Sequence, residues 1–96
     1  MQVFNKTKTA RGFGHIGFVD HYGKQCSIQK SSLAIEDAIW IGIDNPELKF
    51  LAPHGVGWVD YPLHDSVSCV TRMHLTQEQV KGIITILQKF VDTGEI

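Results

Sequence analysis

The stretch VSCVTRMHLTQEQVKGIITILQKFV, residues 67–91, decides the fold of this chain. Side chains alternate along residues 67–74 as they do in a strand. A helix is expected over residues 76–91, because Thr76 is a typical N-cap and Gln79 completes a capping box three residues later. Gly94 is a typical helix stop. The apolar face of this helix has the spacing of three and four residues, and it comprises Val80, Ile83, Ile84, Leu87 and Val91.

Shorter strand patterns precede this stretch. Residues 16–19 and 25–30 alternate on either side of Asp20-His21-Tyr22-Gly23, which has the composition of a turn and predicts a hairpin. Residues 38–43 are apolar on both faces, as in the centre of a sheet, and Pro46 follows the end of this run. Residues 31–37 are compatible with a helical turn or a loop. A short strand is expected over residues 56–61 of the irregular segment 48–63.

These elements predict an α+β fold: an antiparallel sheet of four to five strands with one C-terminal helix packed on one face. At 96 residues, we expect a single α+β domain spanning residues 1–96. Ile86 and Phe90 widen the apolar stripe of the helix. This width indicates either a broad sheet beneath the helix or a homo-oligomer formed through the helix edge at these two residues.

Composition limits the function classes. The hydrophobic share is 43% and the net charge is -1, so no global positive field attracts nucleic acid or an anionic membrane, and we do not expect direct nucleic-acid binding. Residues 5–11 carry three basic side chains and indicate a loop or strand edge, with a local basic finger as the alternative. No apolar run approaches the ~20 residues of a membrane span, and no secretory leader pattern is present. We therefore expect a cytoplasmic protein.

Catalytic motifs are weak throughout. The five histidines show no metal-ligand spacing, and the Gly-x-Gly-x-x-Gly at residues 12–17 precedes a strand pattern instead of a helix. Cys26 alternates with Ile28 and is expected to be buried and inert, and Cys69 is interpreted as a small buried residue too. The sequence predicts a non-enzymatic protein without a cofactor or metal site.

A polar cluster is the strongest candidate for binding. It offers hydroxyl, amide, carboxylate and cationic groups, and a polar ligand or a protein loop would suit it. Trp40, Trp58 and Tyr61 add stacking surface to it, with packing in the core as their alternative role. The alternative is that these residues cap the turn and satisfy its backbone. The candidate binding residues are Gln29, Lys30, Ser31, Ser32, Glu36, Asp37, Trp58, Arg72 and His74.

Several short segments of the sequence carry a family resemblance. They are residues 20–23 (DHYG), 26–32 (CSIQKSS), 36–42 (EDAIWIG), 72–76 (RMHLT) and 90–96 (FVDTGEI). In these segments, which span most of the chain from Asp20 onward, it resembles a group of small accessory proteins encoded by bacteriophages and prophages. The resemblance implies a phage origin and a setting in the host bacterial cytoplasm, and it transfers no catalytic motif.

Three functions follow as hypotheses. The first is a non-enzymatic phage accessory protein that binds and inhibits a bacterial immune component, such as a CRISPR effector; the partner is then a host defence protein. The second is an oligomeric sponge that sequesters an immune-signal nucleotide, with Arg72 and Lys30 at the phosphate and Trp58 on the base. The third is a small metal-dependent hydrolase that uses the histidines with Glu36 or Asp37.

Overall fold

A β-hairpin forms the centre of the computed structural model, which describes residues 3–96. Strands β2 (Gly14–Val19) and β3 (Gln25–Lys30) pair antiparallel across the turn that the sequence predicts. The Asp20 carboxylate closes this turn, because its Oδ1 accepts hydrogen bonds from the backbone N–H groups of Tyr22 (2.9 Å) and Lys24 (2.8 Å). The predicted hairpin is confirmed.

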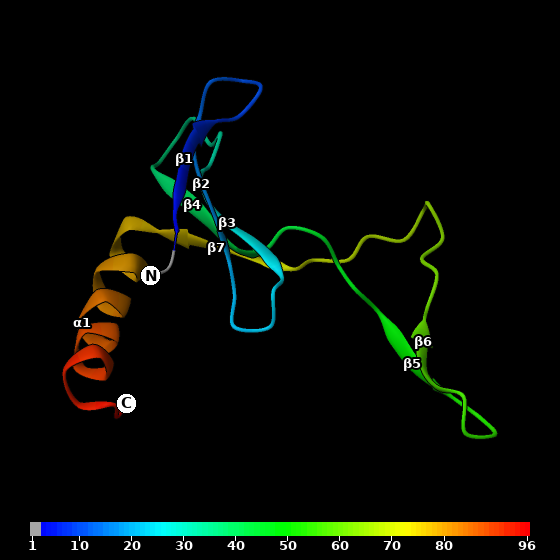
Figure 1. Cartoon of the computed structure of the whole chain (residues 1–96). Coiled ribbons are helices and arrows are strands. Elements are labelled where there is room, and N and C mark those ends of the chain that lie inside the picture. The colour runs from blue at the N-terminus through cyan, green and yellow to red at the C-terminus, as the bar shows by residue number, and fades with distance from the viewer. Residues whose placement is uncertain (1–2) are drawn as a thin grey trace.

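Three further strands extend the hairpin into a five-stranded antiparallel sheet with the order β1-β2-β3-β4-β7 (Figure 1). Strand β4 (Ala38–Ile43) pairs with β3 and lies inside the sheet, as its apolar sequence predicts. Strands β1 (Asn5–Lys8) and β7 (Arg72–Thr76) form the two edges. The basic segment near the N-terminus is therefore a strand edge. The α+β class and the strand number are confirmed.

The register divides the side chains of the sheet between two faces. One face, called the apolar face below, carries the row Ile16, Ile28, Ile41 and Met73, together with Phe18, Cys26, Lys30, Ile39, Ile43 and Leu75. The other, called the polar face, carries the row His15, Gln29, Trp40 and His74, together with Ser27 and Arg72. Most polar side chains of the sheet thus lie on one face and most aliphatic ones on the other, whereas Lys30 is a candidate binding residue on the apolar face.

Helix α1 (Gln77–Thr93) follows β7 without a loop, because Thr76 is both the last residue of the strand and the N-cap of the helix. The predicted capping box is present: Thr76 Oγ1 accepts from the Gln79 N–H at 3.2 Å, and Gln79 Oε1 accepts from the Thr76 N–H at 3.0 Å. Gly94 ends the helix in the left-handed conformation (φ 78°). The helix approaches the sheet beside β7 and then continues beyond it (Figure 1).

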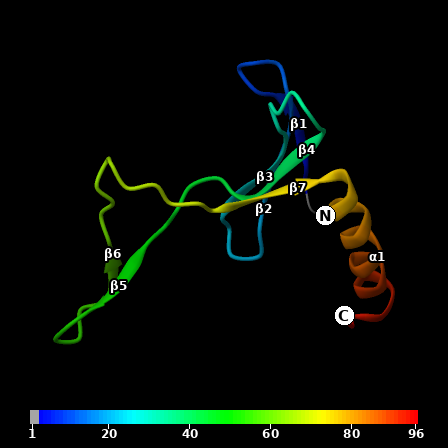
Figure 2. The ribbon, with the colours of Figure 1, turned by 180° about the vertical axis from the view of Figure 1, so that it is seen from behind.

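Strands β5 (Lys49–Ala52) and β6 (Gly57–Asp60) form a second, two-stranded sheet that stands apart from the main one in both views (Figures 1 and 2). The expected short strand at residues 56–61 corresponds to β6, whereas β5 is not predicted. An ion pair between Lys49 Nζ and Asp60 Oδ1 (2.5 Å) joins the two strands at the end of this hairpin opposite its turn.

Residues 31–37 form a loop, one of the two alternatives that the sequence left open. One local expectation is corrected: the strand predicted over residues 67–74 begins only at Arg72. The reason is the length of its neighbour: Arg72 pairs with Gly42 and β4 ends one residue later at Ile43, so the chain before Thr71 has no strand to pair with. Thr71 Oγ1 instead donates a hydrogen bond to the Ile43 carbonyl at 2.6 Å. Cys69, expected in this strand, lies outside it and is half-buried.

Candidate functional site

The polar face is organised around a stack of two rings. Trp40 on β4 and His74 on β7 are directly opposite in the register, which brings their side chains to the same face. The ring centroids are 4.0 Å apart and the planes differ by 10°. The imidazole is exposed and the indole half-buried, so the pair presents aromatic surface to solvent.

A buried hydroxyl holds the imidazole in place. Ser31 is 4% exposed, and its Oγ lies 2.9 Å from His74 Nε2 in a hydrogen bond. The Ser31 backbone is fixed in turn, because its N–H donates to the Ala38 carbonyl at 2.9 Å. The same Oγ accepts from the Leu33 N–H at 3.3 Å, which ties the loop after β3 to the site.

Arg72 supplies the positive charge of the polar face. Its guanidinium carbon lies 5.8 Å from the centroid of the Trp40 ring, within the range of a cation–π contact. Within residues 3–96, Arg72 forms no ion pair. Beside it lies a hollow of about 240 Å³, lined by Trp40, Asp44, Pro46, Cys69, Val70, Thr71 and Arg72. The cation is therefore available to an anionic group of a partner.

A second buried hydroxyl supports the centre of this face. Ser27 is fully buried, and its Oγ donates a short hydrogen bond to Asp44 Oδ1. Gln29 Nε2 donates to the same Ser27 oxygen at 3.1 Å. The amide of Gln29 is thereby held next to Trp40, its neighbour across the strands. Among residues 3–96, every buried side-chain nitrogen or oxygen has a hydrogen-bond partner.

The structure brings four of the nine candidate residues together: Gln29, Ser31, Arg72 and His74 lie on the polar face. The other five lie elsewhere. Lys30 is on the apolar face, where its Nζ pairs with Asp37 Oδ1 at 2.6 Å. Ser32 and Glu36 are exposed in the loop after β3. Trp58 is on β6, in the separate hairpin, with 67% of its surface exposed.

The sequence left the role of Trp40 open between stacking surface and core packing, and Trp40 was not among the nine candidate binding residues. The run at residues 38–43 is apolar at every position, so nothing in it distinguishes the two faces. Only the pairing of β4 with β7 shows that Trp40 shares a face with His74. His15 lies in the same row, but two strands, β3 and β4, separate it from His74, so these histidines do not meet. Its Nδ1 is hydrogen-bonded to Thr7 Oγ1 at 3.2 Å.

Other chemistry has less support in the geometry. Within residues 3–96, no group of three or more His, Cys, Asp or Glu side chains is placed to hold a metal ion. Cys26 is buried at 4% exposure, as expected. Burial, and then the nearby carboxylates of Asp20 and Asp44, raise the pKa of its thiol, which disfavours the nucleophilic thiolate.

Comparisons with known proteins give no assignment, since no family model, no curated protein and no solved structure matches the chain. In the part of the chain that the structure describes, no helix is both long and apolar enough to cross a membrane. The site is therefore interpreted from its own groups. The open face of the sheet presents a guanidinium, two stacked rings, an amide and a buried hydroxyl. These groups are suited to bind a carboxylate, a phosphate or an aromatic group.

Proposed function

We propose that this chain is a phage accessory protein that acts in the host cytoplasm by binding and inhibiting a protein component of bacterial immunity. The observation that carries the proposal is the arrangement of the half-buried Arg72 and Trp40 beside the exposed His74 on the polar face. The resemblance to phage and prophage proteins supports the biological setting.

The composition of this surface favours a protein partner. Trp and Arg are the residue types most enriched among side chains that dominate binding energy at protein interfaces. Here the indole of Trp40 is oriented by the His74 ring, and His74 by Ser31. A surface that is already ordered loses less conformational entropy on binding, which favours affinity. Arg72 would meet an acidic or carbonyl group of the partner, and the stacked rings would cover an apolar one.

A plaque assay tests the proposal. The chain is expressed in a bacterial strain whose CRISPR system targets a chosen phage, and the efficiency of plaquing is measured. Wild-type protein should restore plaquing, and Arg72→Ala should lose most of this effect. Arg11→Ala is the matched control, because it removes a cation from the exposed loop before β2 and leaves the polar face intact. It should behave as wild type.

The same variants can be followed biochemically. Tagged protein should retain one host defence protein from an extract of that strain, identified by mass spectrometry, and Arg72→Ala should retain much less of it. If no defence system of the host is relieved, the inhibitory function is wrong. If relief persists in both Arg72→Ala and Trp40→Ala, the polar face is not the binding surface.

A second candidate function is the sequestration of an immune-signal nucleotide. It is favoured by the position of Arg72 next to both Trp40 and the 240 Å³ hollow, because a guanidinium can bind phosphate while an indole stacks on a base. Trp58 lies in the other sheet and Lys30 on the other face, so Trp40 would take the stacking role. Calorimetric titration with cyclic dinucleotides tests this candidate. Binding that Arg72→Ala abolishes supports it, and the absence of binding to any member of the series contradicts it.

A further inference from the structure

Two apolar surfaces of this chain leave each other largely uncovered. The apolar stripe of α1 is open to solvent: Ile84 is 60% exposed, Leu87 53% and Val91 75%. No residue of α1 is fully buried. On the sheet, Met73 of the apolar face is 57% exposed, and the isoleucines of its row are only half-buried. Residues of this kind are normally covered in a folded protein.

The chain exposes more surface to solvent than a compact monomer of its mass. The accessible surface is 7990 Å² for a chain of 10.8 kDa. A compact monomer of this mass exposes about 5,500 Å², roughly 2,500 Å² less. The radius of gyration is 16.9 Å, compared with about 12.5 Å for a compact domain of this length. The projecting β5–β6 hairpin contributes to both differences. The total excess per chain is of the same order as the area that an obligate dimer interface buries, about 2,000–5,000 Å² in total.

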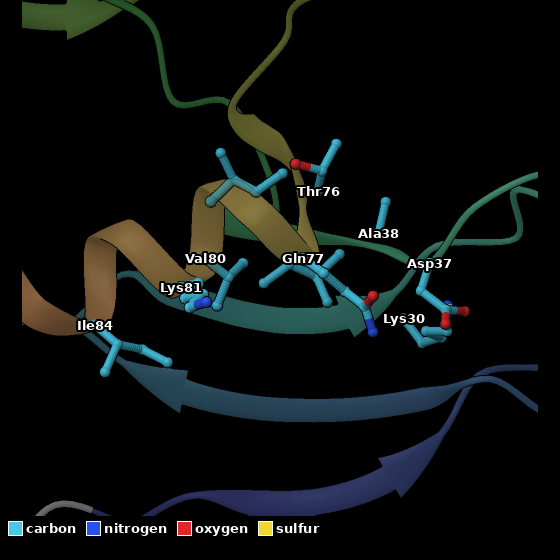
Figure 3. Close-up of a pocket in the computed structure, with 10 residues that line it drawn as sticks. Lys30, Asp37, Ala38, Thr76, Gln77, Val80, Lys81 and Ile84 are labelled. Carbon is cyan, nitrogen blue, oxygen red and sulfur yellow. The ribbon is translucent and has the colours of Figure 1, made fainter.

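An open groove separates the two apolar surfaces. It has a volume of about 470 Å³ and is lined by Lys30, Asp37, Ala38, Ile39, Leu75, Thr76, Gln77, Val80, Lys81 and Ile84. Figure 3 shows Val80 and Ile84 of α1 on the side of the helix that faces the strands. The helix therefore begins against the apolar face, and its later turns diverge from that face (Figure 1).

The joint between β7 and α1 explains why the helix does not close this groove within one chain. Thr76 belongs to the strand and caps the helix, so no flexible residues separate the two elements. The direction in which α1 leaves the sheet is therefore fixed by the strand and by the capping box. The chain cannot fold the C-terminal turns of α1 onto its own sheet without breaking that cap.

We propose that a second copy of this chain fills the groove, and that each copy lays the apolar stripe of its α1 across the apolar face of its partner's sheet. The two surfaces are matched in chemistry, and both are present in every copy. A two-fold arrangement would therefore satisfy both copies at once. Lys30 does not oppose this arrangement, because its charge is already paired with Asp37 in the same chain.

The first experiment is native mass spectrometry with sedimentation equilibrium of the wild-type chain at micromolar concentration. A species of twice the 10.8 kDa chain mass is expected. A monomer throughout the accessible concentration range overturns the proposal, whatever the variants do.

Two pairs of variants locate the interface. Leu87→Asp places a carboxylate in the helix stripe, and Thr85→Asp places the same group on the opposite side of α1. Met73→Lys alters the apolar face of the sheet, and Gln25→Lys alters its polar face. Each interface variant should weaken dimerisation by about 100-fold or more, since an unpaired charge is costly to bury. The two controls should remain dimers with an unchanged circular dichroism spectrum.

Mixing Leu87→Asp with Met73→Lys distinguishes this arrangement from a simple helix–helix dimer. In the reciprocal dimer, the mixed species retains one unaltered helix–sheet contact, and the other contact brings an Asp and a Lys into the same interface. A dimer that contains one copy of each variant should therefore form when neither variant dimerises alone. A dimer that Met73→Lys does not weaken would overturn the proposal, because the apolar face of the sheet would then not be part of the interface.

Discussion

His74 lies flat on Trp40 across the pairing of β7 with β4, with ring centroids 4.0 Å apart and an angle of 10° between the planes. This contact joins the edge strand of the sheet to its neighbour on the polar face. We expect a coupling free energy of about 0.5–1.5 kcal/mol between the two side chains, the range of such ring pairs. A double-mutant cycle of Trp40→Ala and His74→Ala, followed by urea unfolding at one protein concentration, measures it.

The control for this cycle uses the other tryptophan. Trp58 is in the separate hairpin, so Trp58→Ala and His74→Ala should be additive within about 0.3–0.5 kcal/mol. Additivity of the Trp40 pair to the same extent would show that the stacking contributes no stability.

Gly42 should be intolerant of substitution. Its φ is 148°, and an added Cβ would lie 2.6 Å from the Thr71 carbonyl oxygen and 2.9 Å from the Arg72 Cα. Both of these atoms belong to the backbone of the neighbouring segment and cannot rotate away. Gly42→Ala should therefore lower the free energy of unfolding by more than about 1 kcal/mol, measured by denaturant titration.

Gly82 provides the matched comparison for that glycine. It lies within α1, where an added Cβ meets no atom within 4 Å. Gly82→Ala should raise the free energy of unfolding by about 0.4–1 kcal/mol, because alanine restricts the unfolded chain and favours the helix. Equal effects of the two substitutions would contradict the close approach at Gly42.

The capping box of α1 should contribute measurable stability. Thr76→Ala removes the oxygen that accepts from the Gln79 N–H, so the free energy of unfolding should fall by about 1 kcal/mol. Thr85→Ala, in the exposed middle of the same helix, should be neutral or slightly stabilising. Urea unfolding followed by circular dichroism at 222 nm, the usual helix signal, compares the two. A loss of unfolding free energy of the same size at both positions would mean that the capping hydrogen bond adds no stability of its own.

The two cysteines should differ in reactivity. Burial, followed by the charges of Asp20 and Asp44, raises the pKa of the Cys26 thiol, so its thiolate forms only at higher pH. Cys69 is half-buried, so a reagent reaches its thiol more readily than that of Cys26. A chromogenic disulfide reagent should modify Cys69 first in the native protein. Modification of Cys26 should be slow, accelerate as the pH rises, and become complete in denaturant.

Single-cysteine variants assign these rates, with Cys69→Ala reporting on Cys26 and Cys26→Ala on Cys69. Equal rates in the native state would contradict the buried position of Cys26.

Local patterns were sufficient to predict the β2–β3 hairpin, the interior position of β4 and the capped helix. Each depends on neighbours in the sequence: the Asp20 turn, the apolar run before Pro46, and the Thr76–Gln79 box. Strand β6 was expected, but β5 and its pairing with β6 were not, because glycines and prolines interrupt the pattern of residues 48–63. This hairpin also lacks the contacts with a larger core that usually accompany a clear pattern.

The candidate site was only half predictable. Alternation along β3 places Lys30 on the same face as Cys26 and Ile28, so its position on the apolar face was predictable from the sequence. The contribution of Trp40 was not, because it depends on which residue of β7 lies opposite. The separation of Trp58 from Arg72 likewise follows from the sheet to which each strand belongs. The pairing of strands that are distant in the sequence therefore determines the positions of both tryptophans, and local patterns do not reveal it.

Strand β1 has a further consequence for how the protein behaves at high concentration. Its outer edge is unpaired within the described residues, and an unpaired edge is a template on which other chains can add strands and grow into fibres. Lys6 and Lys8 are exposed along this four-residue strand. A short edge with two ammonium groups repels an incoming copy of itself, so β-sheet aggregation from this side is disfavoured.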